Sequence, residues 1–224
     1  MNKRIEGVRI GLLHTTIFAV QPMIDEFRRQ FPEAELVHFL DEGFLPMFAR
    51  FGGASKHVST KALKAAKTAE EAGVNGIQCS CSSLSPAIHC IQPFMLVPTN
   101  DIDSAMAEAA IAHGGAIALL ATGSGVHKSM MSTFERAAAR LGKQPTLKPV
   151  LAETGGIRRG NPGFFEALAE QVHVAARQVD VVAVGQVSMI GCMAFVGDDI
   201  KDRVFTGPPY AVAALKSMIG GIEP

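Results

Sequence analysis

The apolar residues of this chain follow two alternating patterns. Short continuous apolar runs are typical of strands buried on both faces of a sheet. Between them lie stretches with apolar positions every three or four residues, which are typical of amphipathic helices. We predict strands at 8–13, 35–40, 74–79, 95–97, 116–121, 147–151, 181–184 and 203–205. We predict helices at 21–31, 60–72, 84–91, 101–112, 126–141, 162–179 and 209–219.

This alternation predicts an α/β fold with mostly parallel, doubly wound sheets and right-handed crossovers. Two strands resemble each other, and each leads to a polar turn. Residues 73–78 lead to a turn of cysteines and serines, and residues 180–184 lead to Gln186 and Ser188. Two similar halves, with their functional turns facing one another, would explain this similarity.

Two segments rich in glycine and proline interrupt the regular pattern. Residues 41–59 contain Gly43, Pro46, Gly52 and Gly53, and we expect a mobile loop or lid there. Residues 153–162 form a second glycine-containing loop. The size of any pocket depends on both.

The composition narrows the classes of partner. Lys plus Arg equals Asp plus Glu at 21 each, so the net charge gives no reason to expect nucleic acid or an anionic membrane as partner. No apolar run approaches the roughly 20 residues that span a bilayer. Residues 1–6 show no secretory signal. We therefore expect a cytoplasmic protein that acts on a small molecule, and the apolar content allows a homo-oligomer.

The cysteines point to thiol chemistry. Three of the four lie within twelve positions, unlike a disulfide framework, so we interpret them as reduced thiols. Cys81 follows a predicted strand and precedes Ser82 and Ser83. A thiol at a strand-to-helix turn is partly exposed and meets donors that favour its thiolate. Cys79 is the alternative, but it still belongs to the strand. Cys79, Cys81, His89 and Cys90 match usual zinc-ligand spacing poorly.

Several of these segments together resemble the aspartate/glutamate racemase superfamily, which includes hydantoin racemases, maleate isomerases and arylmalonate decarboxylases. They are Ile10-Gly11-Leu12-Leu13-His14-Thr15, Cys81-Ser82-Ser83, Ala121-Thr122 and residues 181–188. The resemblance implies two α/β domains related by a pseudo-twofold axis, with the active site in the cleft between them. It implies neither pyridoxal phosphate nor a metal. We place the first domain at residues 1–98 plus 207–224 and the second at 99–206.

The resemblance also implies roles for individual residues. Cys81 would be the acid/base of the first domain. A second cysteine is expected near the end of strand 181–184, where this chain has Gln186, Val187 and Ser188, and glutamine does not exchange a proton at neutral pH. His14, Ser188 and Cys192 are the candidates for a second acid/base, although core packing suits Cys192 better. The expected substrate-binding residues are Thr15, Ser82, Ser83, Thr122, Ser124 and Gln186.

We therefore expect a cofactor-independent isomerase of the racemase or epimerase type. It would move a proton at a carbon next to the carboxylate or amide group of a small substrate. Two alternatives stay open. One is a single-cysteine decarboxylase or double-bond isomerase of the same superfamily, and the other is a non-catalytic protein that binds a small carboxylate.

Overall fold

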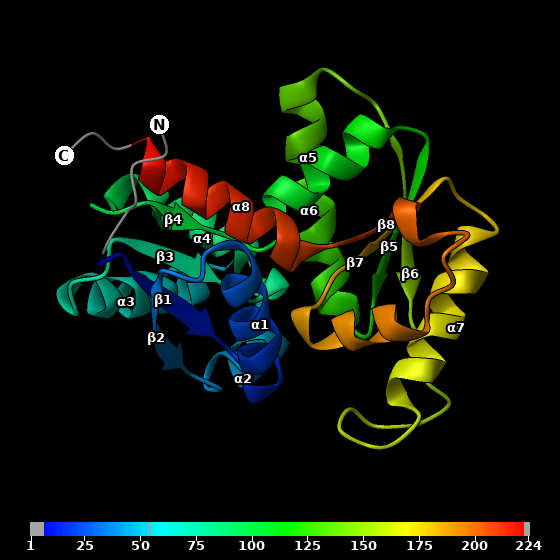
Figure 1. The fold of residues 1–224 in the computed structure, drawn as a ribbon, viewed down its shortest axis with the longest axis horizontal. Coiled ribbons are helices and arrows are strands. Elements are labelled where there is room, and N and C mark those ends of the chain that lie inside the picture. Colours follow the sequence, from blue (N-terminus) through cyan, green and yellow to red (C-terminus); the bar gives the residue numbers. More distant parts are fainter. Residues whose placement is uncertain (1–6, 54, 222–224) are drawn as a thin grey trace.

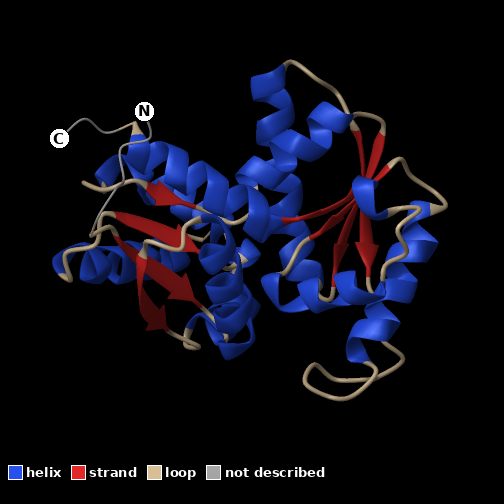
Figure 2. Ribbon diagram, viewed as in Figure 1, coloured by secondary structure: helices blue, strands red, loops and turns tan. Residues whose placement is uncertain are grey.

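The computed structural model describes residues 7–53 and 55–221, so the N-terminal residues 1–6 lie outside it. The chain forms two parallel sheets of four strands each (Figures 1 and 2). The first has the order β2-β1-β3-β4, with β1 at Arg9–His14, β2 at Glu35–Leu40, β3 at Gly76–Cys79 and β4 at Thr99–Asn100. The second has the order β6-β5-β7-β8, with β5 at Ala116–Ala121, β6 at Thr146–Leu151, β7 at Val181–Val184 and β8 at Val204–Thr206.

Helices cover both faces of each sheet (Figure 2). They are α1 (Val20–Gln30), α2 (Phe44–Phe51), α3 (Lys56–Glu71), α4 (Ser85–Ile91), α5 (Ser104–His113), α6 (Ser124–Leu141), α7 (Phe164–Ala176) and α8 (Gly207–Gly220). Short 3-10 helices lie at Ile17–Ala19, Ser82–Leu84, Gln92–Phe94, Val187–Phe195 and Lys201–Arg203. Apolar side chains of α1 and α8 pack on one face of the first sheet and those of α3 and α4 on the other. In the second sheet, α7 covers one face, and α5 and α6 cover the other. The predicted doubly wound α/β fold is confirmed.

The two halves repeat the same strand order and pairing. β1, β2, β3 and β4 correspond to β5, β6, β7 and β8, and all pairs are parallel. The similarity between residues 73–78 and 180–184 therefore has a structural basis, because β3 and β7 hold the same place in their sheets. Each leads into a 3-10 helix at the domain junction.

The chain passes between the domains twice. It leaves the first after β4, which pairs with β3, so the first sheet extends past residue 98, where we expected the boundary. It returns between β8 and α8, and Figure 1 shows α8 lying over the first sheet. The two crossings touch: a Cβ on Gly207 would lie 2.7 Å from the Ile102 carbonyl oxygen. A glycine here lets the two backbones approach closely.

Two predictions at the element level are wrong. Residues 41–59 form α2 and the start of α3 instead of a loop, because Pro46 falls in the first turn of α2, where its missing N–H is not needed. Residues 95–97 form no strand. They follow a 3-10 helix and leave Leu96 89% exposed, and the edge strand begins only at Thr99. Across the described ranges, no helix is long and apolar enough to cross a membrane.

Candidate active site

A cavity of about 320 Å³ lies between the two domains, at the carboxyl ends of the central strands. Ligands of open α/β sheets bind at this edge, and the volume suits a small molecule. The first domain contributes Thr15, Thr16, Ala19, Leu45, Phe48, Ala49, Ser80, Cys81, Ser82 and Ser83. The second domain contributes Gly123, Gly125, Val126, Arg159, Gln186, Val187 and Ser188.

Cys81 is the half-buried thiol of this cavity. It lies two residues beyond the end of β3, as the N-cap of the 3-10 helix Ser82–Leu84, which leads directly into α4. Burial raises the pKa of its thiol, and Asp103 raises it further when that carboxyl group is ionised. The Thr15 hydroxyl and the backbone N–H groups of Ser83 and Leu84 act in the opposite direction, because each can donate a hydrogen bond to the thiolate. The net shift is upward, so the thiol stays protonated at neutral pH.

The other cysteines lie away from the cavity. Cys79 is fully buried in the first sheet, where burial raises its pKa well above the ordinary value. Cys192 packs in the core between α7 and the second sheet, and burial raises its pKa to about 11. Cys90 is exposed on α4. Within the described part of the chain, no three His, Cys, Asp or Glu side chains are placed to hold a metal ion.

Gln186 is the structural counterpart of Cys81. It lies two residues beyond the end of β7 and is the N-cap of the next 3-10 helix, with φ −134° and ψ 126° against −123° and 114° for Cys81. Thr122 corresponds to Thr15, because each directly follows the first strand of its half. The backbone N–H and the hydroxyl of Thr122 both donate to Gln186 Oε1 at 2.8 Å. This leaves the amide NH2 group of Gln186 as the donor for a ligand.

The hydroxyl groups that we expected to bind substrate divide into two sets. Thr15, Ser82 and Ser83 line the cavity, whereas Thr122 and Ser124 do not. Ser188, which we considered as a second acid/base, also lines the cavity. Thr122 holds Gln186 instead, and Ser124 faces a neighbouring hollow. The hydroxyl of Ser82 is already engaged by Asp103 and by the Gly185 carbonyl, so its contribution to the cavity wall is steric.

His14 lies behind the cavity wall. Its Nδ1 is 2.8 Å from Ser80 Oγ, and its Nε2 is 3.0 Å from Nδ1 of His38, a residue of β2. Ser80 lines the cavity and His14 does not. Burial, followed by the proximity of His38, lowers the pKa of His14 to about 4. The imidazole is therefore neutral at pH 7 and is no direct proton donor to a ligand.

Arg159 is a site residue that the sequence did not reveal. It is the one charged side chain among the described cavity-lining residues and lies in the loop between β6 and α7. Its guanidinium carbon is 5.6 Å from the centre of the Phe18 ring. Its Nε is buried and meets no hydrogen-bond acceptor in residues 7–53 and 55–221. We expected the 153–162 loop to shape the pocket, but no pattern there distinguished this arginine from the other basic residues.

Comparisons with known proteins agree on the fold. No protein-family model matches the chain, and no curated protein sequence does. A glutamate racemase structure from Bacillus anthracis covers 96% of this chain and 82% of its own, with a TM-score of 0.72 and 15% identity. An allantoin racemase from Klebsiella pneumoniae covers 95% and 87%, with a TM-score of 0.71 and 14% identity. An aspartate racemase from Picrophilus torridus covers 96% and 95%, with a TM-score of 0.66 and 12% identity. The expected resemblance to the aspartate/glutamate/hydantoin racemase superfamily is confirmed at the level of fold.

Proposed function

Because the chain shares its two-domain fold with glutamate, allantoin and aspartate racemases, we propose that it is an isomerase-type enzyme that transfers a proton at the carbon next to a carboxylate. The main support for this proposal is the position of Cys81. The thiol of Cys81 lines the interdomain cavity and meets three groups that can donate to its thiolate. A thiol and thiolate pair is a suitable general acid and base for an acidic carbon. Such a transfer requires no redox partner.

Arg159 and Gln186 supply the groups that would hold the substrate. The Arg159 guanidinium, whose Nε meets no acceptor in the described residues, suits a carboxylate, which accepts paired hydrogen bonds from arginine. The NH2 group of Gln186 can donate to the same carboxylate as it gains enediolate character in the transition state. Leu45, Phe48 and Ala49 of α2 form an apolar wall that would contact the remainder of the substrate. We infer that carboxylates bind better than the corresponding amides.

A specific observation also favours a one-sided reaction as the second candidate. Among the described residues that line the cavity, Cys81 is the only thiol, and Gln186 occupies the matching position. In a decarboxylation, the bond between the carbon and one carboxylate breaks, carbon dioxide leaves, and the electron pair forms an enediolate with the remaining carboxylate. The Cys81 thiol then gives its proton to this carbon, and the thiolate takes a new proton from solvent.

Isotope exchange distinguishes these functions. A panel of acidic amino acids, ureides such as allantoin and α-substituted malonates would be incubated with the protein in heavy water and followed by NMR. Deuterium entering the α-position with loss of optical activity supports racemisation. Release of carbon dioxide with one deuterium per product supports the one-sided reaction. Tight binding of a carboxylate without exchange, isomerisation or carbon dioxide release would show a binding protein and contradict the proposal.

A further inference from the structure

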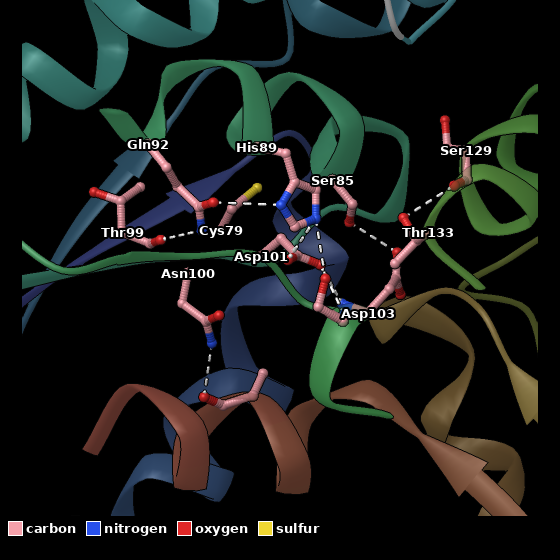
Figure 3. Close-up of polar contacts among 12 residues, drawn as sticks. Cys79, Ser85, His89, Gln92, Thr99, Asn100, Asp101, Asp103, Ser129 and Thr133 are labelled. Carbon is pink, nitrogen blue, oxygen red and sulfur yellow. Dashed lines mark hydrogen bonds and ion pairs between the residues drawn. The ribbon is translucent and has the colours of Figure 1, made fainter. Parts of the chain in front are cut away.

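Two buried carboxylates lie beneath the Cys81 turn, in the segment that connects β4 to α5. Asp101 and Asp103 are each 1% exposed. Figure 3 shows them next to His89 and Ser85 of α4. Burial of two such groups side by side disfavours the state in which both are ionised. Their contacts determine which one carries the charge.

Asp101 is the ionised member of the pair. Its Oδ1 accepts the backbone N–H groups of Asp103 and Ser104 at 2.8 and 2.9 Å. Its Oδ2 lies 3.2 Å from Nε2 of His89, within ion-pair distance, but accepts no well-directed hydrogen bond from the described residues. Burial raises the pKa of Asp101, but the contact with His89 and the other hydrogen bonds outweigh this and hold it below its ordinary value.

Asp103 is in contact with the segment that carries the thiol. Ser85 Oγ lies 2.8 Å from its Oδ2, and Ser82 Oγ lies 2.9 Å from its Oδ1. Ser82 Oγ also contacts the carbonyl oxygen of Gly185, which directly precedes Gln186 in the second domain. A serine hydroxyl has one proton, and a carbonyl oxygen has none to give. Ser82 therefore makes two separate two-centre hydrogen bonds only when Asp103 is a neutral acid that donates to Ser82; with an ionised Asp103, the two acceptors share one proton.

The corresponding positions of the second domain hold no acidic pair. In the strand register, Thr206 and Pro208 take the places of Asp101 and Asp103, since β8 pairs with β7 as β4 pairs with β3. The acids therefore serve the half of the molecule that carries the thiol.

We propose that Asp103 is a positioning residue that acts as a neutral carboxylic acid. It holds the Cys81 turn against the second domain through Ser82 and keeps a negative charge away from the thiol. Ionisation of Asp103 removes a proton from the link between Ser82 and Gly185 and places a like charge near the thiolate of Cys81. The link joins the two turns that face the cavity. The proposal rests on the proposed function only in its use of Cys81 as the acid/base.

The surroundings of Asp103 set the pH at which this happens. Burial, followed by the charge of Asp101, raises its pKa to about 7. The other titratable groups around the pair are His89 of α4, which pairs with Asp101, the thiols of Cys79 and Cys81, and Arg136 of α6, which interacts with Asp101. The proton of Asp103 is thus gained or lost near neutral pH, while Asp101 stays ionised.

Infrared spectroscopy of the wild-type protein tests the protonation directly. At about pH 6 ordinary carboxylates are ionised. We expect one carbonyl band of a buried protonated acid at that pH, which disappears as the pH rises through about 7 and is missing in Asp103→Asn. Absence of the band from the wild-type spectrum at about pH 6, or its persistence in Asp103→Asn, would overturn the proposal. The wild-type spectrum alone gives the first of these two results, and neither measurement requires a substrate.

Alkylation of Cys81 by iodoacetamide tests the effect on the thiol. The Asp103→Asn variant replaces the acid by an uncharged amide that could still donate to Ser82, and Asp202→Asn, which removes an exposed acid, is its control. Because a nearby like charge shifts a thiol by up to about one pKa unit, Cys81 of Asp103→Asn should react at the wild-type rate near pH 6 and about three to ten times faster near pH 8.5. The exposed Cys90 in the same digest is the internal reference. A rate ratio that does not change with pH contradicts the proposal. Neither readout requires turnover, so both can succeed even if the proposed function fails.

Discussion

Opposing influences act on the thiol of Cys81. Burial favours the protonated thiol, as does Asp103 when it is ionised, whereas the Thr15 hydroxyl and two backbone N–H groups favour the thiolate. The net upward shift means that the resting group at neutral pH is an acid. This suits delivery of a proton to a carbanion, and a base is generated only in the fraction that ionises.

The proposed contact between Arg159 and the substrate carboxylate predicts how a substitution of this arginine changes substrate use. Arg159→Met should lower kcat/KM for a carboxylate substrate by about 10- to 100-fold, because charge-assisted hydrogen bonds contribute about 1.5–3 kcal/mol. Arg158→Met is the matched control, since Arg158 is the neighbour in the same loop and does not line the cavity. Steady-state kinetics or carboxylate titration measures both. Equal losses in the two variants would exclude a specific role for Arg159.

The lowered pKa of His14 predicts how the stability of the protein depends on pH. Its folded pKa of about 4 lies below the ordinary 6.5, so the folded state binds fewer protons than the unfolded state between these values. The contribution of neutral His14 to the free energy of unfolding is complete above pH 6.5 and is lost as the pH falls toward 4. When the pH is lowered from about 7 to about 5, the free energy of unfolding measured in urea should fall by about 2 kcal/mol more for the wild type than for His14→Gln. Parallel pH curves for the two proteins would contradict the neutral, buried state of His14.

At the scale of elements, the two turns after β3 and β7 are one arrangement used twice. Each places an N-cap residue at the cavity and a threonine from the neighbouring strand end beside it. The pairs are Thr15 with Cys81 and Thr122 with Gln186. The first pair can exchange protons, whereas the second offers a fixed amide donor. The asymmetry of the chemistry therefore lies in a single side chain of a repeated element.

Gln186→Cys should restore the missing thiol. With a thiol on each side of the cavity, the racemisation rate of an optically pure substrate should rise by at least about tenfold over wild type, because a positioned acid/base contributes about 10²–10⁴. Gln186→Ser is the control, since a hydroxyl of similar size to the thiol is a poor acid. Polarimetry measures the rate. If both variants racemise equally slowly, the pseudo-twofold match does not extend to the chemistry.

The sequence predicted the elements whose local pattern agrees with their tertiary setting. Strand 181–184 was placed correctly because an apolar run between two polar turns has few alternatives. Helix α2 was missed because Gly43, Pro46 and Gly52 are typical loop residues, although here they lie at its ends or in its first turn. The apolar character of residues 95–97 predicts a strand, yet no neighbouring strand pairs with this run among the described residues.

At the scale of the molecule, the site exists only where the two domains meet. The sequence predicted the turns that carry Cys81 and Gln186, because both follow recognisable strands, and both turns line the cavity. It did not point to Arg159, which reaches the cavity from a loop, or to Asp103, which contacts Ser82 and Ser85 from the linker between the domains. The resemblance to racemases likewise provided the fold, whereas the contacts of Ser82 and Thr122 came only from the structure.

In the proposed reaction, Cys81 transfers the proton. The most direct test measures deuterium incorporation at the α-carbon of an active acid from the panel, in heavy water, for wild type, Cys81→Ser and Cys90→Ser. We predict that the exchange rate of Cys81→Ser is at least about 100-fold lower than that of the wild type, as expected for removal of a general acid/base. Cys90→Ser should match wild type, since this exposed thiol on α4 lies outside the cavity. Undiminished exchange in a folded Cys81→Ser protein would contradict the assignment of Cys81 as the acid/base.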